Sequence, residues 1–317
     1  MRMMSQRQGF VPAPARTPGD ADYPVAVHDS LPVLPRVGDV TVGVVDIGLV
    51  VDGDNQPHPW FDDHVVFEPC EAYSLPDAPA PLARFDGHAD FVTGLILQEA
   101  PTARVRVIAA IDRSDINNRR PASKDEDYLV AQAISALAAH EHVQVINLSF
   151  SGDMFTEDRD ATKISEAISA HPDIAFVAAA GNDGSDHPVW PAAFDGVHAV
   201  GALDLRRLVP SGAIPKAWFS NWGSWVNFYD SGVQELSSFL TFDDESSDDF
   251  GLRAPQRFRG WARWSGTSFA AARVSGRIAR IVAEHGGTGA AAANSLSKAS
   301  PLIGTSGARW VGGARVC

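Results

Sequence analysis

Short apolar segments alternate with helical patterns along the middle of this chain, and this alternation limits the folds open to it. Strands are expected at residues 40–45, 104–110, 143–148, 174–179 and 197–201, and helices at 125–140 and 161–170. Strands that are joined through helices pair in parallel, with helices on both faces of the sheet. The sequence therefore predicts an α/β fold, a three-layer sandwich around a central, mostly parallel sheet.

Composition restricts the partners of such a domain. The 26 basic and 39 acidic residues give a formal net charge of −13, which argues against a nucleic-acid partner. The N-terminus lacks the apolar run of a signal peptide, and no segment holds 18 uninterrupted apolar residues. We therefore expect a cytoplasmic protein without a membrane partner. Cys70 and Cys317 are the only two cysteines, so no disulfide framework is expected; the oligomeric state is left open.

Two shifts in composition divide the chain. Residues 1–37 contain six prolines and read as an extended leader that wraps the domain or stays mobile, and residues 38–285 carry the predicted domain. An acidic insertion near residues 235–260 contains five acids between Asp243 and Asp249. We expect a solvated loop there, with a structural calcium ion as the alternative. Residues 286–317 are expected to form a C-terminal tail.

Four polar residues begin or end the predicted elements and could carry chemistry. Ser268 lies within Gly266–Ala271 on the first turn of a predicted helix, where the helix terminus favours negative charge. Asp46 ends the first strand, His88 lies on the first turn of a helix, and Asn182 follows a buried strand. Alone, each is typical of a cap, a turn or a structural residue. Together they supply a nucleophile, a base, a carboxylate and an amide donor.

The order of these residues resembles that of the subtilisin-like serine proteases over about residues 38–285. Further matching segments are Val145–Phe150, Ala178–Asp183, Trp190–Ala192, Val197–Ala202 and Phe219–Gly223. The resemblance implies that Ser268 attacks the scissile carbonyl while His88 accepts and returns the proton. It also implies that Asp46 orients the imidazole, and that Asn182 and the Ser268 N–H bind the oxyanion.

The same resemblance implies where substrate binds, and it requires neither a cofactor nor a catalytic metal. A polypeptide substrate would lie extended against the backbone of the segment from residue 149 to 151. Val189 is expected at the floor of the specificity pocket, which predicts a small or medium apolar residue before the scissile bond. The predicted substrate-binding residues are Ser149, Phe150, Ser151, Ala180, Gly181 and Val189.

The chain also departs from the family pattern. Ala89–Asp90 follows the histidine where the family usually has Gly-Thr, so a carboxylate could raise the pKa of His88 or compete for its ring. Asp230–Ser231–Gly232 replaces Ala-Pro-Gly, and the stretch from there to Gly266 is longer than usual. Only 45 residues precede Asp46, too few for a signal peptide and a folded pro-domain, so residues 1–37 are interpreted as a short inhibitory leader.

Three functions remain compatible with this sequence. The leading hypothesis is a serine endopeptidase that works through an acyl-enzyme. A peptide-maturation protease or transpeptidase would use the same triad, with an amine capturing the acyl group in the transpeptidase. A catalytically inactive binding or regulatory protein is the alternative from another class.

Overall fold

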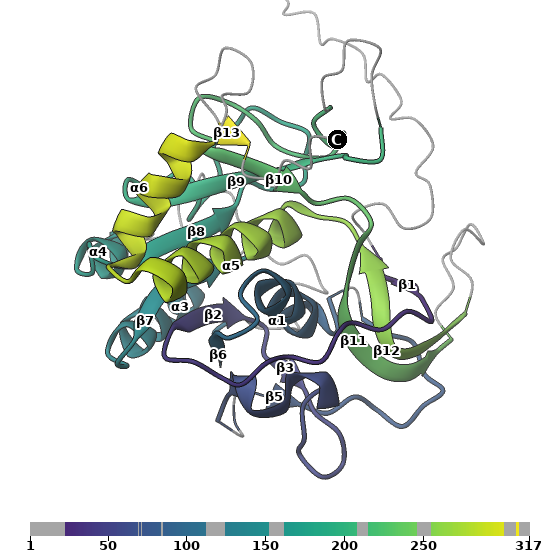
Figure 1. Cartoon of the computed structure of the whole chain (residues 1–317). Coiled ribbons are helices and arrows are strands. Elements are labelled where there is room, and N and C mark those ends of the chain that lie inside the picture. The colour runs from purple at the N-terminus through teal and green to yellow at the C-terminus, as the bar shows by residue number, and fades with distance from the viewer. Residues whose placement is uncertain are drawn as a thin grey trace, which may run out of the picture.

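A computed structural model describes residues 23–68, 70, 72–83, 85–111, 124–151, 162–207, 215–245, 255–300 and 309–310. Its main element is an eight-stranded, entirely parallel sheet (Figure 1). The strands are β2 (Thr41–Asp46), β4 (Val65–Val66), β6 (Arg104–Ala109), β7 (Val143–Leu148), β8 (Ala175–Ala179), β9 (Val197–Leu203), β10 (Phe228–Ser231) and β13 (Arg309–Trp310). They are arranged in the order β13-β10-β9-β8-β7-β2-β6-β4. All five predicted strands are confirmed.

Apolar side chains alternate between the two faces of the sheet. Val42 and Val44 of β2 belong to one buried cluster, whereas Val45 belongs to a second cluster on the opposite face. In β8, Val177 faces the first cluster and Phe176 the second. Because successive side chains of a strand point to opposite faces, near-continuous apolar strands require cover on both sides.

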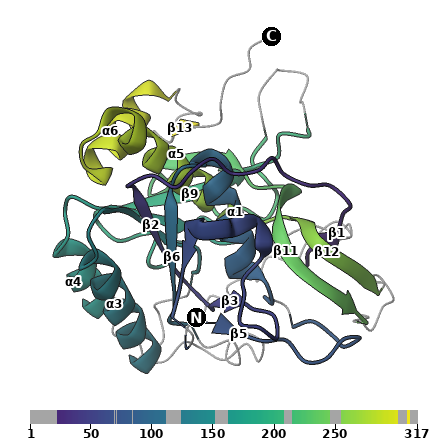
Figure 2. The ribbon, with the colours of Figure 1, turned by 60° about the horizontal axis from the view of Figure 1, so that its bottom comes forward.

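Helices provide that cover and complete the three layers. Helices α1 (His88–Glu99), α5 (Thr267–His285) and α6 (Gly289–Ala299) pack on one face, and α3 (Lys124–Ala138) and α4 (Thr162–Ser169) pack on the other (Figure 2). The predicted helices at 125–140 and 161–170 are thus confirmed, as is the α/β sandwich. Within the described ranges, no helix combines the length and apolar character that a membrane crossing requires.

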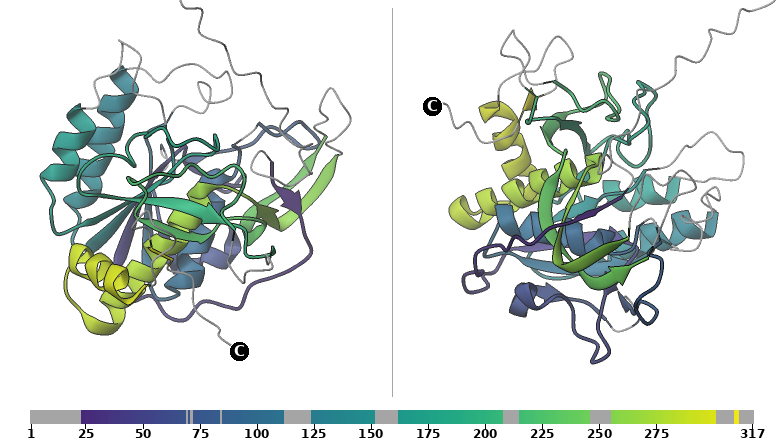
Figure 3. Two further views of the ribbon diagram at one scale, coloured as in Figure 1. Left: turned by 90° about the horizontal axis from the view of Figure 1, so that it is seen from above. Right: turned by 90° about the vertical axis from the view of Figure 1, so that its right-hand side faces the viewer.

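The segment interpreted as an acidic loop contains a β-hairpin. Strands β11 (Glu235–Asp244) and β12 (Gln256–Trp264) pair antiparallel and form a small sheet with β1 (Val25–Ala26). The loop prediction is wrong for Asp244, which is buried in β11 and accepts a hydrogen bond from the Leu82 N–H. In the left view of Figure 3, the hairpin and helices α3 and α4 lie on opposite sides of the molecule. Residues 246–254 lie outside the described ranges.

The predicted leader and tail both contribute ordered segments. Leader strand β1 pairs with the edge of β12, and the Trp60 indole donates a hydrogen bond to Pro32 O. Leader residues 1–22 lie outside the described ranges. Within the expected tail, α6 places Ala292 and Ala293 in the main buried cluster, so its packing belongs to the domain. The remaining short elements are β3 (Leu49–Val50), β5 (Ala72–Tyr73) and the 3-10 segment η1 (Pro59–His64).

Helices α1 and α5 cross with very little space between them. A Cβ atom on Gly276 of α5 would lie 2.6 Å from Glu99 Cβ and 2.7 Å from Ile96 O, both in α1. The second of these atoms is backbone, so no side-chain rotation can relieve the overlap. The absence of a side chain at Gly276 therefore sets the distance between the two helices.

We expect Gly276→Ala to destabilise the fold. Overpacking typically costs about 1–3 kcal/mol, against a gain of about 1 kcal/mol in helix propensity, so the expected net loss is about 1 kcal/mol. Urea unfolding measures this difference, with Gly53→Ala as control because a Cβ there meets nothing within 4 Å. An unchanged unfolding midpoint for Gly276→Ala would contradict the close crossing.

Candidate active site

Asp46 and His88 form a buried pair at the carboxyl edge of the sheet. Asp46 ends β2 and His88 is the first residue of α1, following Gly87, whose φ of 76° turns the chain into the helix. His88 Nδ1 lies 3.0 and 2.9 Å from the two Asp46 carboxylate oxygens. Because a carboxylate can only accept, Nδ1 is the donor in this pair; in the neutral tautomer with that proton, the lone pair is on Nε2.

Aromatic rings enclose His88. Trp264 meets its ring edge-on at a centroid distance of 5.8 Å, and Phe269 and Phe85 lie 5.7 and 6.0 Å away. Trp264 belongs to the hairpin strand β12 and Phe269 to α5, so two separate elements fix the ring's orientation. These apolar neighbours exclude water, which strengthens the Asp46–His88 hydrogen bond.

Ser268 is the second residue of α5 and is 8% exposed. Its hydroxyl donates a hydrogen bond to Ser149 O at 2.9 Å. Among the described residues, it makes no hydrogen bond to His88, and the Ser268 N–H has no acceptor. The first N–H groups of a helix lack partners within the helix, so this one can bind an external acceptor.

Asn182 is held beside the start of α5 by Thr267. The Thr267 backbone N–H and hydroxyl both donate to the Asn182 side-chain oxygen at 2.9 Å. A backbone N–H can only donate, so the atom it meets must be the amide oxygen. The Nδ2 group of Asn182 thus keeps both donors, with no acceptor among the described residues. Asn182 is exposed, so these donors lie at the protein surface near the N-terminus of α5.

Asn147 and Ser275 are two buried polar residues that support the site and were not identified from sequence. The Ser149 hydroxyl lies 2.7 Å from Asn147 Oδ1 and 3.0 Å from Ser268 O, and the Asn147 side-chain N–H₂ donates to Ser275 Oγ at 3.0 Å. These contacts join the end of β7 to α5. A polar asparagine within the apolar strand 143–148 was the available signal, because buried polar groups are nearly always hydrogen-bonded.

The predicted pocket residues lie in three different environments. Gly181, with φ of 95°, lies over Val189: a Cβ there would be 3.4 Å from Val189 Cγ2. Val189 is buried in the cluster that Phe150 also contacts. The Ala180 methyl packs instead in a small separate cluster, and Ser151 is exposed. Phe150, Gly181 and Val189 are therefore adjacent to one buried cluster, and the Ala180 side chain is not.

Asp90 bonds to the backbone of β3, and Asp46, not Asp90, is the carboxylate at the histidine ring. The Asp90 carboxylate accepts the Val50 N–H at 3.0 Å, and Asp46 occupies His88 Nδ1. Asp90 is 1% exposed. Burial raises the pKa of Asp90 to about 7; the Val50 N–H opposes this shift, and the negative charge of Asp46 adds to it. Asp90 thus ties β3 to the first turn of α1.

No cation site is apparent in these ranges. Across the described segments, no three His, Cys, Asp or Glu side chains gather in a group able to hold a metal ion. Asp248 and Asp249 of the acidic run lie outside these segments. Calcium binding at that run therefore stays a prediction.

Comparison with known proteins agrees with this geometry. The model of the subtilase family, peptidase S8, matches residues 38–300. The chain belongs to the subtilase family. A thermophilic serine proteinase of Bacillus sp. (strain AK1) is 29% identical over 262 residues, which is 78% of this subtilase and 55% of that relative. The subtilase thus spans about half the length of this curated relative.

Solved structures support the fold of this subtilase. A cold-adapted subtilisin-like serine proteinase has a TM-score of 0.59 at 20% identity, covering 86% of this chain and 88% of the other. A lanthipeptide protease has a TM-score of 0.59 at 19% identity, with coverages of 84% and 81%. The prenylagaramide maturation protease PagA has a TM-score of 0.59 at 22% identity, with 84% of both chains covered.

We expect Asp90→Asn to stabilise this subtilase above neutral pH. The unfolded carboxyl loses its proton near pH 4, but the folded one keeps it until about pH 7, so the stability of the wild type falls as pH rises between these values. The variant has no titrating group at this position. Its unfolding free energy relative to the wild type should therefore increase by up to about 4 kcal/mol as the pH rises. Urea unfolding of both proteins from pH 4 to pH 8 measures this difference. The contributions of the other titrating groups are the same in both proteins and cancel. A difference that stays constant with pH would contradict the assignment.

Proposed function

We propose that this subtilase is a serine endopeptidase that hydrolyses polypeptides through an acyl-enzyme. One observation carries the proposal: the Asp46–His88 pair lies against Phe269 in the first turn of α5, which also carries Ser268 and, through Thr267, holds the Asn182 amide. These are the parts that acyl transfer requires, namely a nucleophile, an oriented base and two oxyanion donors.

The chemistry follows from these positions. Rotation about χ1 frees the Ser268 hydroxyl from Ser149 O, and His88 Nε2 accepts its proton as Oγ attacks the scissile carbonyl. The Ser268 N–H and Asn182 Nδ2 donate to the oxyanion. Collapse breaks the C–N bond and His88 gives its proton to the leaving amine. Water then attacks the acyl-enzyme with the same proton transfers through His88, and the carboxylic acid is released. Asp46 stabilises the imidazolium that forms in each step.

A substrate would bind in an extended conformation along residues 149–151. Ser149 O, the present acceptor of the Ser268 hydroxyl, becomes available to a substrate N–H once the serine turns towards His88. Phe150, Gly181 and Val189 would form the pocket for the residue before the scissile bond. The branched Val189 side chain limits the depth of that pocket, so a small or medium apolar residue fits best.

Peptide maturation is the second candidate. Two structurally similar proteins are named as a lanthipeptide protease and a prenylagaramide maturation protease. The same triad would serve a narrow maturation protease, and a transpeptidase would let an amine in place of water attack the acyl-enzyme. Hydrolysis products and amine-transfer products of one peptide, resolved by mass, separate the two outcomes.

We also propose that the leader regulates this peptidase activity. Its strand β1 pairs with Ala262 and Arg263 of β12, next to Trp264, one of the rings against His88. Self-removal of part of residues 1–37 would release an inhibitory segment, and sequencing the N-terminus of active enzyme tests this. An intact N-terminus in fully active enzyme contradicts removal.

We expect a fluorophosphonate probe to label the purified chain at Ser268, because the probe requires an activated serine. Ser268→Ala should abolish both labelling and peptide hydrolysis, and the exposed Ser224→Ala should leave them unchanged. Labelling is read by gel fluorescence and peptide mapping. A wild-type chain that is not labelled, with the leader removed, would favour the inactive binding protein.

We expect Asn182→Ala to lower kcat by about 10²–10³-fold, the usual effect of losing one oxyanion donor. KM for a short peptide should change little, because the donor acts on charge that develops in the transition state. Steady-state kinetics over a range of peptide concentrations around KM measure both constants. An unchanged kcat would remove Asn182 from the oxyanion site.

A further inference from the structure

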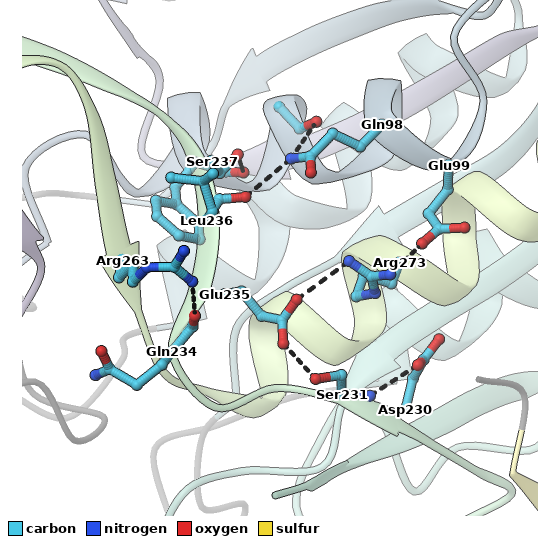
Figure 4. A network of polar contacts seen from close by, with 12 residues as sticks. Gln98, Glu99, Asp230, Ser231, Gln234, Glu235, Leu236, Ser237, Arg263 and Arg273 are labelled. Carbon is cyan, nitrogen blue, oxygen red and sulfur yellow. Dashed lines mark hydrogen bonds and ion pairs between the residues drawn. The ribbon is translucent and has the colours of Figure 1, made fainter. Parts of the chain in front are cut away.

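A buried ion network joins α1, α5 and the turn between β10 and β11 (Figure 4). Arg273 and Arg277 lie one turn apart on α5. Arg273 contacts Glu235 at 3.1 Å and also pairs with Glu99, the last residue of α1. Arg277 contacts Asp230 at 2.9 Å and Glu99 at 3.3 Å. Glu99 is therefore shared by both arginines, which connects the two helices through one carboxylate.

In this network, acidic and basic side chains compensate one another's buried charge. Burial raises the pKa of the Asp230 and Glu235 carboxyls, and the neighbouring arginine charges oppose that rise. At the rim, Arg280 lies 3.8 Å from Glu99 with its side chain 44% exposed. Removing a buried partner leaves another charge uncompensated, so the groups hold one another in place.

The network reaches the candidate nucleophile through the turn at residues 231–235. The Ser231 hydroxyl donates to the Glu235 carboxylate. The Gly266 N–H donates to Gly232 O at 2.8 Å, and the Gln234 N–H donates to Ser265 Oγ at 2.9 Å. This turn therefore holds the two residues that lead into Thr267 and Ser268.

The turn and the start of α5 are also in close contact. A Cβ atom on Gly232 would lie 2.8 Å from Gly266 O, so the turn packs closely against the residue that precedes α5. Arg273 lies five residues beyond Ser268 on the same helix. The Glu235–Arg273 pair is therefore linked to Ser268 in two ways. One link runs through the turn to Gly266, and the other runs through the first turns of α5.

We propose that Glu235 and Arg273 are positioning residues for the Ser268 nucleophile. Their ion pair fixes the turn at residues 231–235 against α5, and this contact fixes the direction of the Ser268 hydroxyl and N–H relative to His88 and Asn182. The inference rests on the proposed peptidase function. It involves Asp230 and Ser231, at which this chain departs from the Ala-Pro expected of its family.

Kinetics distinguish positioning from stabilisation alone. Glu235→Gln is the main variant, because its amide oxygen can still accept from Ser231 and Arg273 keeps its contact with Glu99. Arg273→Met is the second variant, and Arg273→Lys is the conservative one. The control is Arg280→Met, which lies on the same helix and touches Glu99 but does not reach the turn.

The full-length chain is assayed well below its unfolding temperature for kcat, KM and the rate constant of fluorophosphonate labelling. For Glu235→Gln and Arg273→Met we expect kcat and the labelling rate constant to fall about ten-fold or more, with KM within two-fold of the wild type, since small misplacements of reacting groups cost large factors. Arg273→Lys should recover most of the loss. Arg280→Met should keep wild-type kcat even if it unfolds at a lower temperature.

Two results would overturn this inference in distinguishable ways. Folded Glu235→Gln that unfolds earlier but keeps wild-type kcat and labelling would leave the network a purely stabilising role. If Arg273→Met does not fold, Glu235→Gln carries the test alone. A wild-type chain without Ser268 labelling would overturn the proposed function together with this inference.

Discussion

The close crossing of α1 and α5 is the constraint on which the site depends. Gly276 lets the two helices approach until backbone and side-chain atoms are in contact. Both helices lie on the same face of the parallel sheet, and one begins with His88 and the other with Thr267–Ser268. Asp46 ends β2 beneath them, so the fold alone gathers a carboxylate, an imidazole and a hydroxyl at one edge.

Hydrogen bonds then fix these groups within that frame. Thr267 orients the Asn182 amide, and Ser149 joins the end of β7 to α5. The hairpin β11–β12 takes part as well, because it supplies Trp264 against His88 and Glu235 against Arg273. The longer stretch before the Gly-Thr-Ser motif therefore contributes residues both to the site and to the contacts that support it.

Much of this arrangement could be predicted from sequence. The buried strands are continuous apolar runs, and Asp46, His88, Asn182 and Ser268 lie at element ends, where local patterns are clear. The hairpin was missed because the acidic run drew the interpretation towards a loop. Its signal was present in the alternation of β12, where Phe258, Ala262 and Trp264 are buried. The ion network could not be predicted, because its partners are far apart in the chain and only the packing of α1, α5 and the β10–β11 turn brings them together.

Direct observation of an acyl-enzyme tests the central claim most closely. A p-nitrophenyl ester mixed rapidly with the chain should release a burst of one equivalent of nitrophenol, and acid quenching followed by peptide mapping should place the acyl group on Ser268. The same mixing with His88→Ala should lose the burst. An acyl group on another residue, or a burst that persists in His88→Ala, would contradict the account.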